Sequence, residues 1–378
     1  MTIDNTLLII SGTLLVFSFV TPMLNVMFRR LQQPTDDTQT PPYPKVSILF
    51  VVDENLPSLE RNISYFQQQD YESGFDIIVV SNKSKKDTDH LLKQFGSSLS
   101  VHHTFVPPSS RYMSRKKLAV TLGVKAAKTE WIILIEPTLK PTSNQWLKTM
   151  AAHFTDKHDM VMGYSYYETA TDYQHFLHHQ TMRYLMMRAS KSTAYRTNMN
   201  NIAFRKSNFI AQDGFRGNLK YIGGEYDFLV NKYAKKGNTA VALTQEAWME
   251  EEPPSKRQWD NTQLFYQATR KHLRRSFFHR LIYGFDTFFM LLHYVILLVV
   301  LCFSVMTKMW WMTIVALIAF VITYIYRAFI ARKALKAFHQ NIPAWKLPFF
   351  EIRAIITRTT TFLKYWKSDK YDFICHKI

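Results

Sequence analysis

Residues 131–138 read Trp-Ile-Ile-Leu-Ile-Glu-Pro-Thr, an apolar run that ends in an acidic residue. An uninterrupted run of this kind is typical of a β-strand buried on both faces, because a half-exposed strand alternates apolar with polar residues. We therefore predict a strand over 131–135 with Glu136 at its carboxyl end. In open α/β sheets, ligands bind beyond the carboxyl ends of the strands, so Glu136 is the first candidate functional residue.

The sequence before this strand alternates short apolar runs with stretches of helical spacing. Such alternation is typical of an α/β domain in which a parallel sheet carries helices on both faces. The turns after the first two strands contain Asp53, Glu54, Asn82 and Lys83, which we expect at the same sheet edge as Glu136. The predicted strands are 46–52, 76–80 and 101–106, and the predicted helices are 55–69, 87–95 and 114–128.

Three apolar segments outside this domain are long enough to cross a bilayer. Residues 7–28 contain no charge, and 288–307 and 310–326 form a pair separated by Lys308 and Met309 alone. A helix rises 1.5 Å per residue, so about 20 residues span the hydrocarbon core. We predict an uncleaved N-terminal anchor and a C-terminal transmembrane hairpin; a buried hairpin in a soluble core is the alternative.

Lysine and arginine residues flank the apolar segments at 29–30, 270–280 and 327–336. The positive-inside rule then predicts a multi-pass membrane protein with its N-terminus outside and the 29–287 region cytosolic. The formal net charge of +18 fits contact with anionic membrane lipids, and we expect no nucleic acid partner because no nucleic-acid-binding motif accompanies the charge. The predicted domains are an anchor at 1–30, a linker at 31–43, the α/β domain at 44–275, the hairpin with basic flanks at 276–336 and a cytosolic amphipathic tail at 337–378.

Short segments between residues 44 and 272 match, in order, the motifs of one enzyme family. Lys116 begins a sequence close to that family's Lys-x-x-Ala-Leu-x-x-Gly helix, and residues 201–206 resemble its Asn-Leu-Ala-Tyr-Arg-Lys strand. Residues 224–231 resemble its Gly-Asp-Asp-Asp-Leu-Phe-Val-Asn segment, and 267–270 its Gln-x-x-Arg element. By these motifs the chain is identified as a member of the membrane-bound family 2 glycosyltransferases of bacterial type. The resemblance implies a GT-A fold, the Rossmann-like fold of nucleotide-diphospho-sugar transferases.

The resemblance implies the inverting transfer of a sugar from a UDP- or GDP-sugar to a lipid-linked or saccharide acceptor at the cytosolic membrane face. The product would be a surface polysaccharide or a glycolipid. Such a reaction requires that the charge of the leaving diphosphate be offset and that the acceptor hydroxyl lose its proton. A catalytically inactive homologue that acts as a partner or scaffold in a glycan-assembly complex is the alternative.

The metal-binding Asp-x-Asp motif of the family is replaced here by Glu136-Pro137-Thr138. The resemblance implies Glu136 as the metal ligand, because Mg²⁺ and Mn²⁺ prefer oxygen ligands. A threonine hydroxyl is a poor substitute for a carboxylate, so the sequence leaves open whether a divalent metal is used. Basic side chains could offset the diphosphate charge instead. They are Lys83, Lys116, Lys117 and Arg270.

The base motif is altered as well, because Glu225-Tyr226-Asp227 stands where the family has three acids. The family's base position falls on Tyr226, and a phenol is not a base near neutral pH. The predicted catalytic residues are Glu225 or Asp227 as the base, with Gln267 and Arg270. The predicted nucleotide-binding residues are Asp53, Glu54, Asn82, Lys83 and Lys117.

Overall fold

The computed structural model describes residues 5–25, 31, 38–53, 55–81, 100–106, 113–198 and 200–375. The chain divides into two compact units. The helical unit comprises residues 1–30, 172–184 and 275–357, and the sheet unit comprises residues 31–171, 185–274 and 358–378. The predicted helix at 87–95 and the arginines at 29–30 lie outside the described residues.

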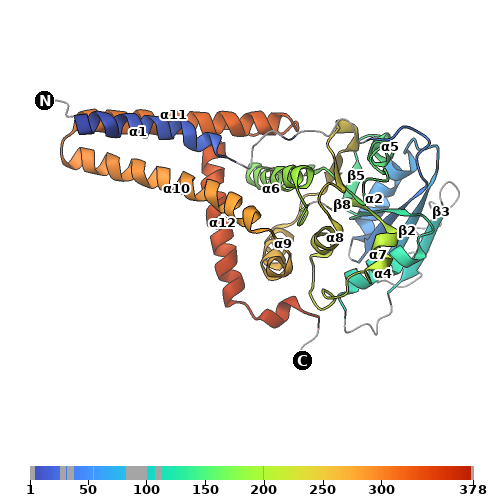
Figure 1. Cartoon of the computed structure of the whole chain (residues 1–378). Helices are drawn as coiled ribbons and strands as arrows, with labels where there is room; N and C mark the ends of the chain where they lie inside the picture. Colours follow the sequence, from blue (N-terminus) through green and yellow to red (C-terminus); the bar gives the residue numbers. More distant parts are fainter. Residues whose placement is uncertain are drawn as a thin grey trace. The chain divides into compact units, whose positions relative to one another are not determined.

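The sheet unit is built on a seven-stranded sheet with the order β3-β2-β1-β4-β8-β6-β9 (Figure 1). The first four strands in this order are parallel, and all seven residues of β1 are buried, as the continuous apolar run predicts. The strands are β1 (Val46–Val52), β2 (Phe75–Ser81), β3 (Ser100–Phe105), β4 (Trp131–Ile135), β6 (Met160–Gly163), β8 (Asn201–Arg205) and β9 (Thr239–Ala242).

The four strands predicted to form a parallel sheet do so, whereas β8, whose direction was not predicted, runs antiparallel to both β4 and β6. The first four residues of β8 are buried, so its sequence is that of a strand covered on both faces. That pattern is the same in either direction, because side chains alternate between the faces whichever way a strand runs. Burial therefore predicted the strands and left the direction of β8 undetermined.

Helices cover both faces of this sheet, as the alternating pattern predicts. Phe50 of β1 meets Phe66 of α2 with ring centroids 5.1 Å apart, and Phe66 meets Trp146 at 5.8 Å. Leu49 faces the other side, where a Cβ added to Gly123 of α4 would lie 2.2 Å from its Cδ1. The helices of the sheet unit are α2 (Leu56–Gln67), α4 (Arg115–Ala126), α5 (Trp146–Ala151), α7 (Lys206–Ala211), α8 (Glu225–Tyr233) and α9 (Lys256–Thr269), with short 3₁₀ turns η2 (Gln245–Ala247), η3 (Arg270–His272) and η5 (Lys370–Phe373).

A second, three-stranded sheet lies in the same unit, with the order β5-β10-β7. Its central strand β10 pairs antiparallel with β5 and parallel with β7. The strands are β5 (Leu139–Pro141), β7 (Ser165–Tyr167) and β10 (Met249–Glu251). Because β5 begins three residues after Glu136, this small sheet extends from the carboxyl end of β4.

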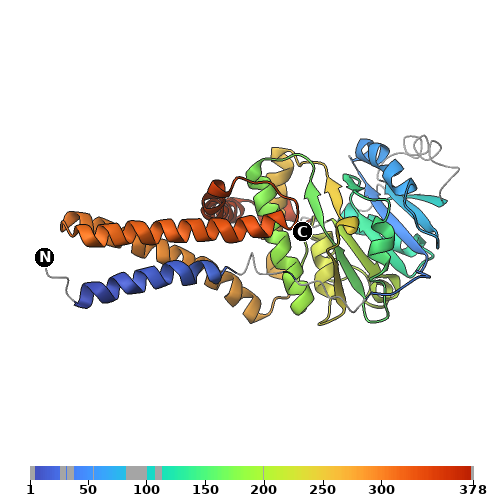
Figure 2. The ribbon, with the colours of Figure 1, turned by 90° about the horizontal axis from the view of Figure 1, so that it is seen from above.

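The helical unit contains three helices that are long and apolar enough to cross a membrane: Asn5–Met23, Gly284–Met306 and Trp310–Lys336. They belong to α1, α10 and α11, which lie side by side as long rods in Figures 1 and 2. Leu14, Leu297 and Met312 pack where the three meet. The helix bounds are α1 (Asn5–Met23), α10 (Phe277–Met306) and α11 (Trp310–Lys336), while α6 (Asp172–Lys191) and α12 (Leu347–Lys367) contribute residues to both units and η4 (Ala344–Lys346) precedes α12.

Candidate active site

Glu136 follows β4 directly and begins the turn into β5. The Leu139 amide donates to the Glu136 carbonyl over 3.1 Å, which closes a four-residue turn with Pro137 in its second position. Proline is favoured there because its ring fixes φ near the value that the turn needs. The Glu136 amide donates to the carbonyl of Asn200 over 3.3 Å, and the residue is only 7% exposed. The turn therefore holds a buried carboxylate at the carboxyl edge of the main sheet.

Two neighbours engage this carboxylate. The Lys116 ammonium of α4 forms an ion pair with Glu136 Oε1, and the Tyr226 hydroxyl of α8 donates to the same carboxylate. Burial, together with the charge of Glu136, raises the pKa of Tyr226 well above its ordinary value. Burial alone would lower the pKa of Lys116, but the charges of Glu136, Glu225 and Glu251 outweigh it and raise that pKa. Lys116 is thus a cation and Tyr226 a neutral phenol at pH 7.

Glu251 of β10 is a further carboxylate of the site, and it is not among the residues predicted from the sequence. It is 9% exposed, and Asn200 Nδ2 donates to its Oε1 over 3.0 Å. Burial raises the pKa of Glu251 to about 7, and the charge of Glu136 acts in the same direction. The hydrogen bond from Asn200 and the charge of Lys116 oppose that rise. The signal in the sequence is the run Glu250-Glu251-Glu252, because alternate residues of a strand face opposite sides.

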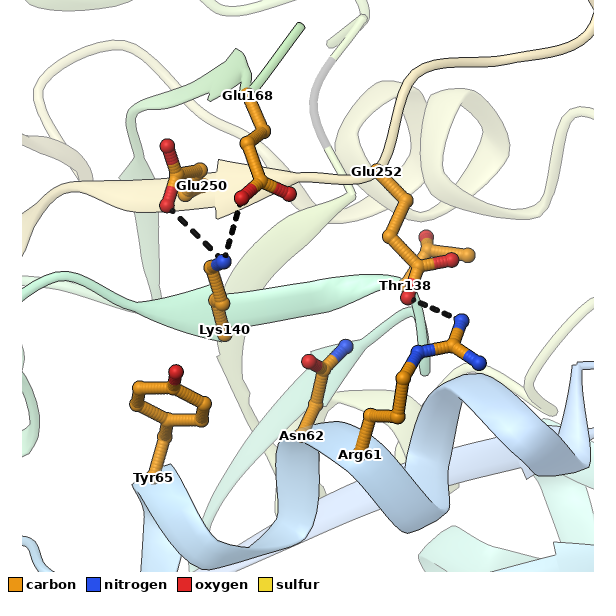
Figure 3. A pocket seen from close by; sticks show the side chains of 8 residues that line it. All are labelled: Arg61, Asn62, Tyr65, Thr138, Lys140, Glu168, Glu250 and Glu252. Carbon is orange, nitrogen blue, oxygen red and sulfur yellow. Dashed lines mark hydrogen bonds and ion pairs between the residues drawn. The ribbon is translucent and has the colours of Figure 1, made fainter.

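The other two glutamates of that run face a separate polar pocket of about 250 Å³. Figure 3 shows Glu250 and Glu252 directed to this pocket, opposite side chains of α2. Lys140 of β5 pairs with Glu250 at 3.3 Å and with Glu168 at 3.1 Å, and Arg61 pairs with Glu252 at 2.7 Å. The pocket is lined by Arg61, Asn62, Tyr65, Thr138, Lys140, Glu168, Glu250 and Glu252. Thr138 therefore lines this pocket, on the face of the small sheet opposite Glu251.

The two acids of α8 have different surroundings. Glu225 is the first residue of the helix and accepts a hydrogen bond from Ser114 Oγ over 3.4 Å. Asp227 accepts a hydrogen bond from the Thr197 amide over 3.1 Å and lies 3.4 Å from Arg196 Nε. Burial raises the pKa of Asp227, although the charge of Arg196 and the Thr197 amide act against the rise. The Asp227 carboxylate is therefore held in place by the Thr197 amide and by Arg196.

Lys117 is fully buried, and its ammonium donates to the carbonyls of Tyr221 and of Gly223, the latter over 3.0 Å. Burial lowers the pKa of Lys117 to about 8, against the charges of Glu225 and Cys375. The side chain thus fastens the loop before α8. A direct contact between Lys117 and a nucleotide stays a prediction, and it would require the ammonium to leave these carbonyls.

Of the other predicted residues, Gln267 and Arg270 are at least partly buried, Asp53 is exposed, and three lie outside the described part of the chain. Gln267 of α9 is buried, and its Oε1 has no hydrogen-bond partner within the described ranges. Arg270 in η3 is half-buried, and Asp53 after β1 is exposed. Glu54, Asn82 and Lys83 lie outside the described residues.

Residues 48–219 match the sequence profile described as Glycosyl transferase family 2. This segment is a family 2 glycosyltransferase domain. The mannosyltransferase PcManGT from Pyrobaculum calidifontis, solved in complex with GDP-Man and Mn²⁺, shares the fold. It aligns over 94% of this chain and 95% of its own, at 13% identity and a TM-score of 0.52. The GT-A fold predicted from the sequence is confirmed.

Other similarities are weaker. TarS 1–349 of S. aureus, in complex with UDP-GlcNAc, aligns over 85% of this chain and 92% of its own, at 13% identity and a TM-score of 0.41. GalNAc-T7 with UDP, GalNAc and Mn²⁺ aligns over 60% of this chain and 49% of its own, at 14% identity and a TM-score of 0.39. No curated protein sequence matches the chain.

The side chains around Glu136 do not fit the two-carboxylate metal site that the glycosyltransferase family implies. The Glu136 carboxylate is paired with the Lys116 ammonium, and Thr138 lines the pocket on the other face of the small sheet. Across the described ranges, no group of three or more His, Cys, Asp or Glu residues could hold a metal ion. The Lys116 ammonium stands beside the carboxylate where a bound cation would be expected. Glu136 as a metal ligand stays a prediction.

The structure brings together residues that the sequence placed in different motifs. Glu136 was predicted as the metal ligand and Glu225 as the base, and the charges of both raise the pKa of Lys116. Glu251, Asn200 and the hydroxyl of Tyr226 complete the group and were missed as functional residues. We call the set Lys116, Glu136, Asn200, Glu225, Tyr226 and Glu251 the carboxylate cluster.

Proposed function

We propose that the chain is a membrane-anchored, inverting glycosyltransferase. It moves a sugar from a UDP- or GDP-sugar to a lipid-linked or saccharide acceptor at the cytosolic face of a bacterial inner membrane. The products belong to surface polysaccharide or glycolipid synthesis. The family 2 domain supports the class of reaction, and the three apolar helices support the membrane anchoring. The basic residues beside those helices support a cytosolic catalytic domain with the N-terminus outside.

The observation that carries the proposal is a charged lysine at the carboxyl edge of the sheet. The Lys116 side chain is 36% exposed, and three carboxylates keep it protonated against the effect of its partial desolvation. An ammonium held in this way is suited to bind the oxygens of a nucleoside diphosphate, because charge-assisted hydrogen bonds to phosphate are strong. As the donor loses its sugar, Lys116 stabilises the negative charge that develops on the leaving diphosphate.

The altered motifs favour one alternative, an inactive homologue that serves as a partner or scaffold. Tyr226 occupies the family's base position, and Glu136 is already engaged by Lys116. Nucleotide binding separates the two functions, because a chain that binds neither UDP nor GDP has no donor to use.

The test is calorimetry of the detergent-solubilised full chain with UDP and with GDP, in Mn²⁺ and in EDTA. Lys116→Met is compared with Lys140→Met, which removes an ion-paired lysine from the opposite face of the small sheet. We expect Lys116→Met to weaken nucleotide binding about 10- to 100-fold, the worth of a hydrogen bond to a charged group. Lys140→Met should bind as wild type does.

Turnover is then measured as release of UDP or GDP from UDP-glucose, UDP-GlcNAc and GDP-mannose in the presence of a bacterial lipid extract. Release that depends on the extract supports the transferase. A well-folded wild-type chain that binds neither nucleotide would sink the proposal and favour the scaffold.

A further inference from the structure

A glycosyl transfer needs a group that accepts the proton of the acceptor hydroxyl. The family position for this group holds Tyr226, whose hydroxyl is already a hydrogen-bond donor to Glu136. Asp227 is bound to Arg196 and to the Thr197 amide. The usual base motif therefore leaves Glu225 as its one remaining acid.

Glu225 is poorly placed for the task. It is the first residue of α8, where the positive end of the helix dipole and the unsatisfied amides hold an anion in place. It also supplies negative charge to both Lys116 and Lys117. Its carboxylate is thus already engaged by the Ser114 hydroxyl at 3.4 Å and by the helix terminus.

Glu251 lies in β10 on the face of the small sheet opposite the polar pocket, since its neighbours Glu250 and Glu252 line that pocket (Figure 3). It is 9% exposed, and one carboxylate oxygen is positioned by Asn200 Nδ2 at 3.0 Å. The charged and titratable groups facing it are Glu136 after β4, Lys116 of α4, Tyr226 of α8 and Tyr167 of the paired strand β7.

In this setting the Glu251 carboxyl is partly protonated near neutral pH. Burial and the charge of Glu136 raise the pKa of Glu251 to about 7, which matches the pH at which an enzyme works. A general base is most effective when its pKa lies near the operating pH.

We propose that Glu251 is the catalytic base of the transfer, a role that rests on the proposed function. The acceptor oxygen forms a bond to the anomeric carbon while the bond from that carbon to the diphosphate oxygen breaks. The electron pair of the broken bond leaves with the diphosphate beside Lys116. The hydroxyl proton passes to the Glu251 carboxylate and is later released to water.

The test compares Glu251→Gln with Glu250→Gln, the same change one residue away on the opposite face of the same strand. We expect Glu251→Gln to lower kcat about 10²- to 10⁴-fold, the usual worth of a general base. UDP or GDP binding by calorimetry should stay within about 3-fold of wild type, because Gln keeps the shape and the hydrogen-bonding oxygen. Glu250→Gln should retain the wild-type kcat.

The pH profile separates a base from a merely structural residue. Wild-type kcat should rise with pH through about 7 and then level off, because only the ionised carboxylate accepts the proton. The rise should disappear in Glu251→Gln and return in Glu251→Asp. If wild type transfers sugar while Glu251→Gln keeps its kcat and its pH profile, Glu251 is not the base and the transferase stands. If wild type binds no nucleotide and releases none, both proposals fall.

Discussion

Replacing Glu251 with Gln should stabilise the sheet unit above neutral pH. The pKa of the Glu251 carboxyl lies at about 7 in the folded chain, against an ordinary value of 4.5. The folded state therefore binds more protons than the unfolded state between these values, and the free energy of unfolding falls as pH rises through that window. Each pKa unit corresponds to 1.36 kcal/mol, so linkage gives a total loss of about 3 kcal/mol by pH 8.

Glutamine does not ionise and escapes this loss. We expect Glu251→Gln to exceed wild type in unfolding free energy by about 1 kcal/mol at pH 5 and about 3 kcal/mol at pH 8. For a domain of 150–250 residues, 1 kcal/mol moves Tm by about 2–4 °C, so the Tm difference should widen by roughly 5 °C between these pH values.

The assay is thermal unfolding of the full chain in detergent at pH 5 and at pH 8. Glu250→Gln is the control, because its side chain is 24% exposed and paired with Lys140. Its Tm is compared with that of wild type at the same two pH values. A Tm difference between Glu251→Gln and wild type that is equal at both pH values would refute the reasoning, since it would mean that the carboxyl ionises as freely in the fold as outside it.

Three other perturbations test separate parts of the chain. With the Lys116 ammonium beside Glu136, replacing Mn²⁺ by EDTA should change UDP or GDP affinity by less than about 3-fold. A tenfold or larger loss of affinity in calorimetry would show that nucleotide binding depends on a metal. Asp227→Asn should leave Arg196 as an uncompensated buried charge and cost about 3–5 kcal/mol, seen as a lower Tm; an unchanged Tm with lost turnover would instead make Asp227 catalytic. Arg327 Nε lies 2.6 Å from Glu351, with both side chains buried, so Arg327→Met should cost about 3–5 kcal/mol in the same assay. Changing both residues of that pair to Met should recover most of this loss, and a double variant as unstable as the single one contradicts the pairing argument.

The central strands could be predicted from the sequence because a strand buried on both faces is an uninterrupted run of apolar residues. The strand β1 occupies Val46–Val52 and β4 occupies Trp131–Ile135, as their apolar runs predict. The position of Glu136 at the end of β4 followed from the same pattern. What the runs could not supply is the direction of β8, because a strand covered on both faces has the same composition whichever way it runs.

The site was harder to predict because residues adjacent in the sequence make different contacts in the fold. Lys116 and Lys117 are adjacent and identical, yet successive helical residues point about 100° apart. Lys116 meets Glu136, whereas Lys117 binds backbone carbonyls of the loop before α8. Similarly, the run 250–252 has the composition of a solvated acidic stretch. The pairing of β10 with a strand on each side is what shows that Glu251 faces the opposite side of the small sheet from Glu250 and Glu252.

The departure from the family motif at position 226 is linked to a single ion pair. Glu136 is the ion-pair partner of the Lys116 ammonium, and Thr138 lines the separate polar pocket. A carboxylate at position 226 would add another negative charge beside Glu136, whereas the neutral phenol of Tyr226 donates to it. We assign the proton acceptor to Glu251, whose pKa lies near 7. The change at 226 therefore goes together with the Lys116–Glu136 ion pair, because a neutral hydrogen-bond donor beside Glu136 leaves that carboxylate to the ammonium.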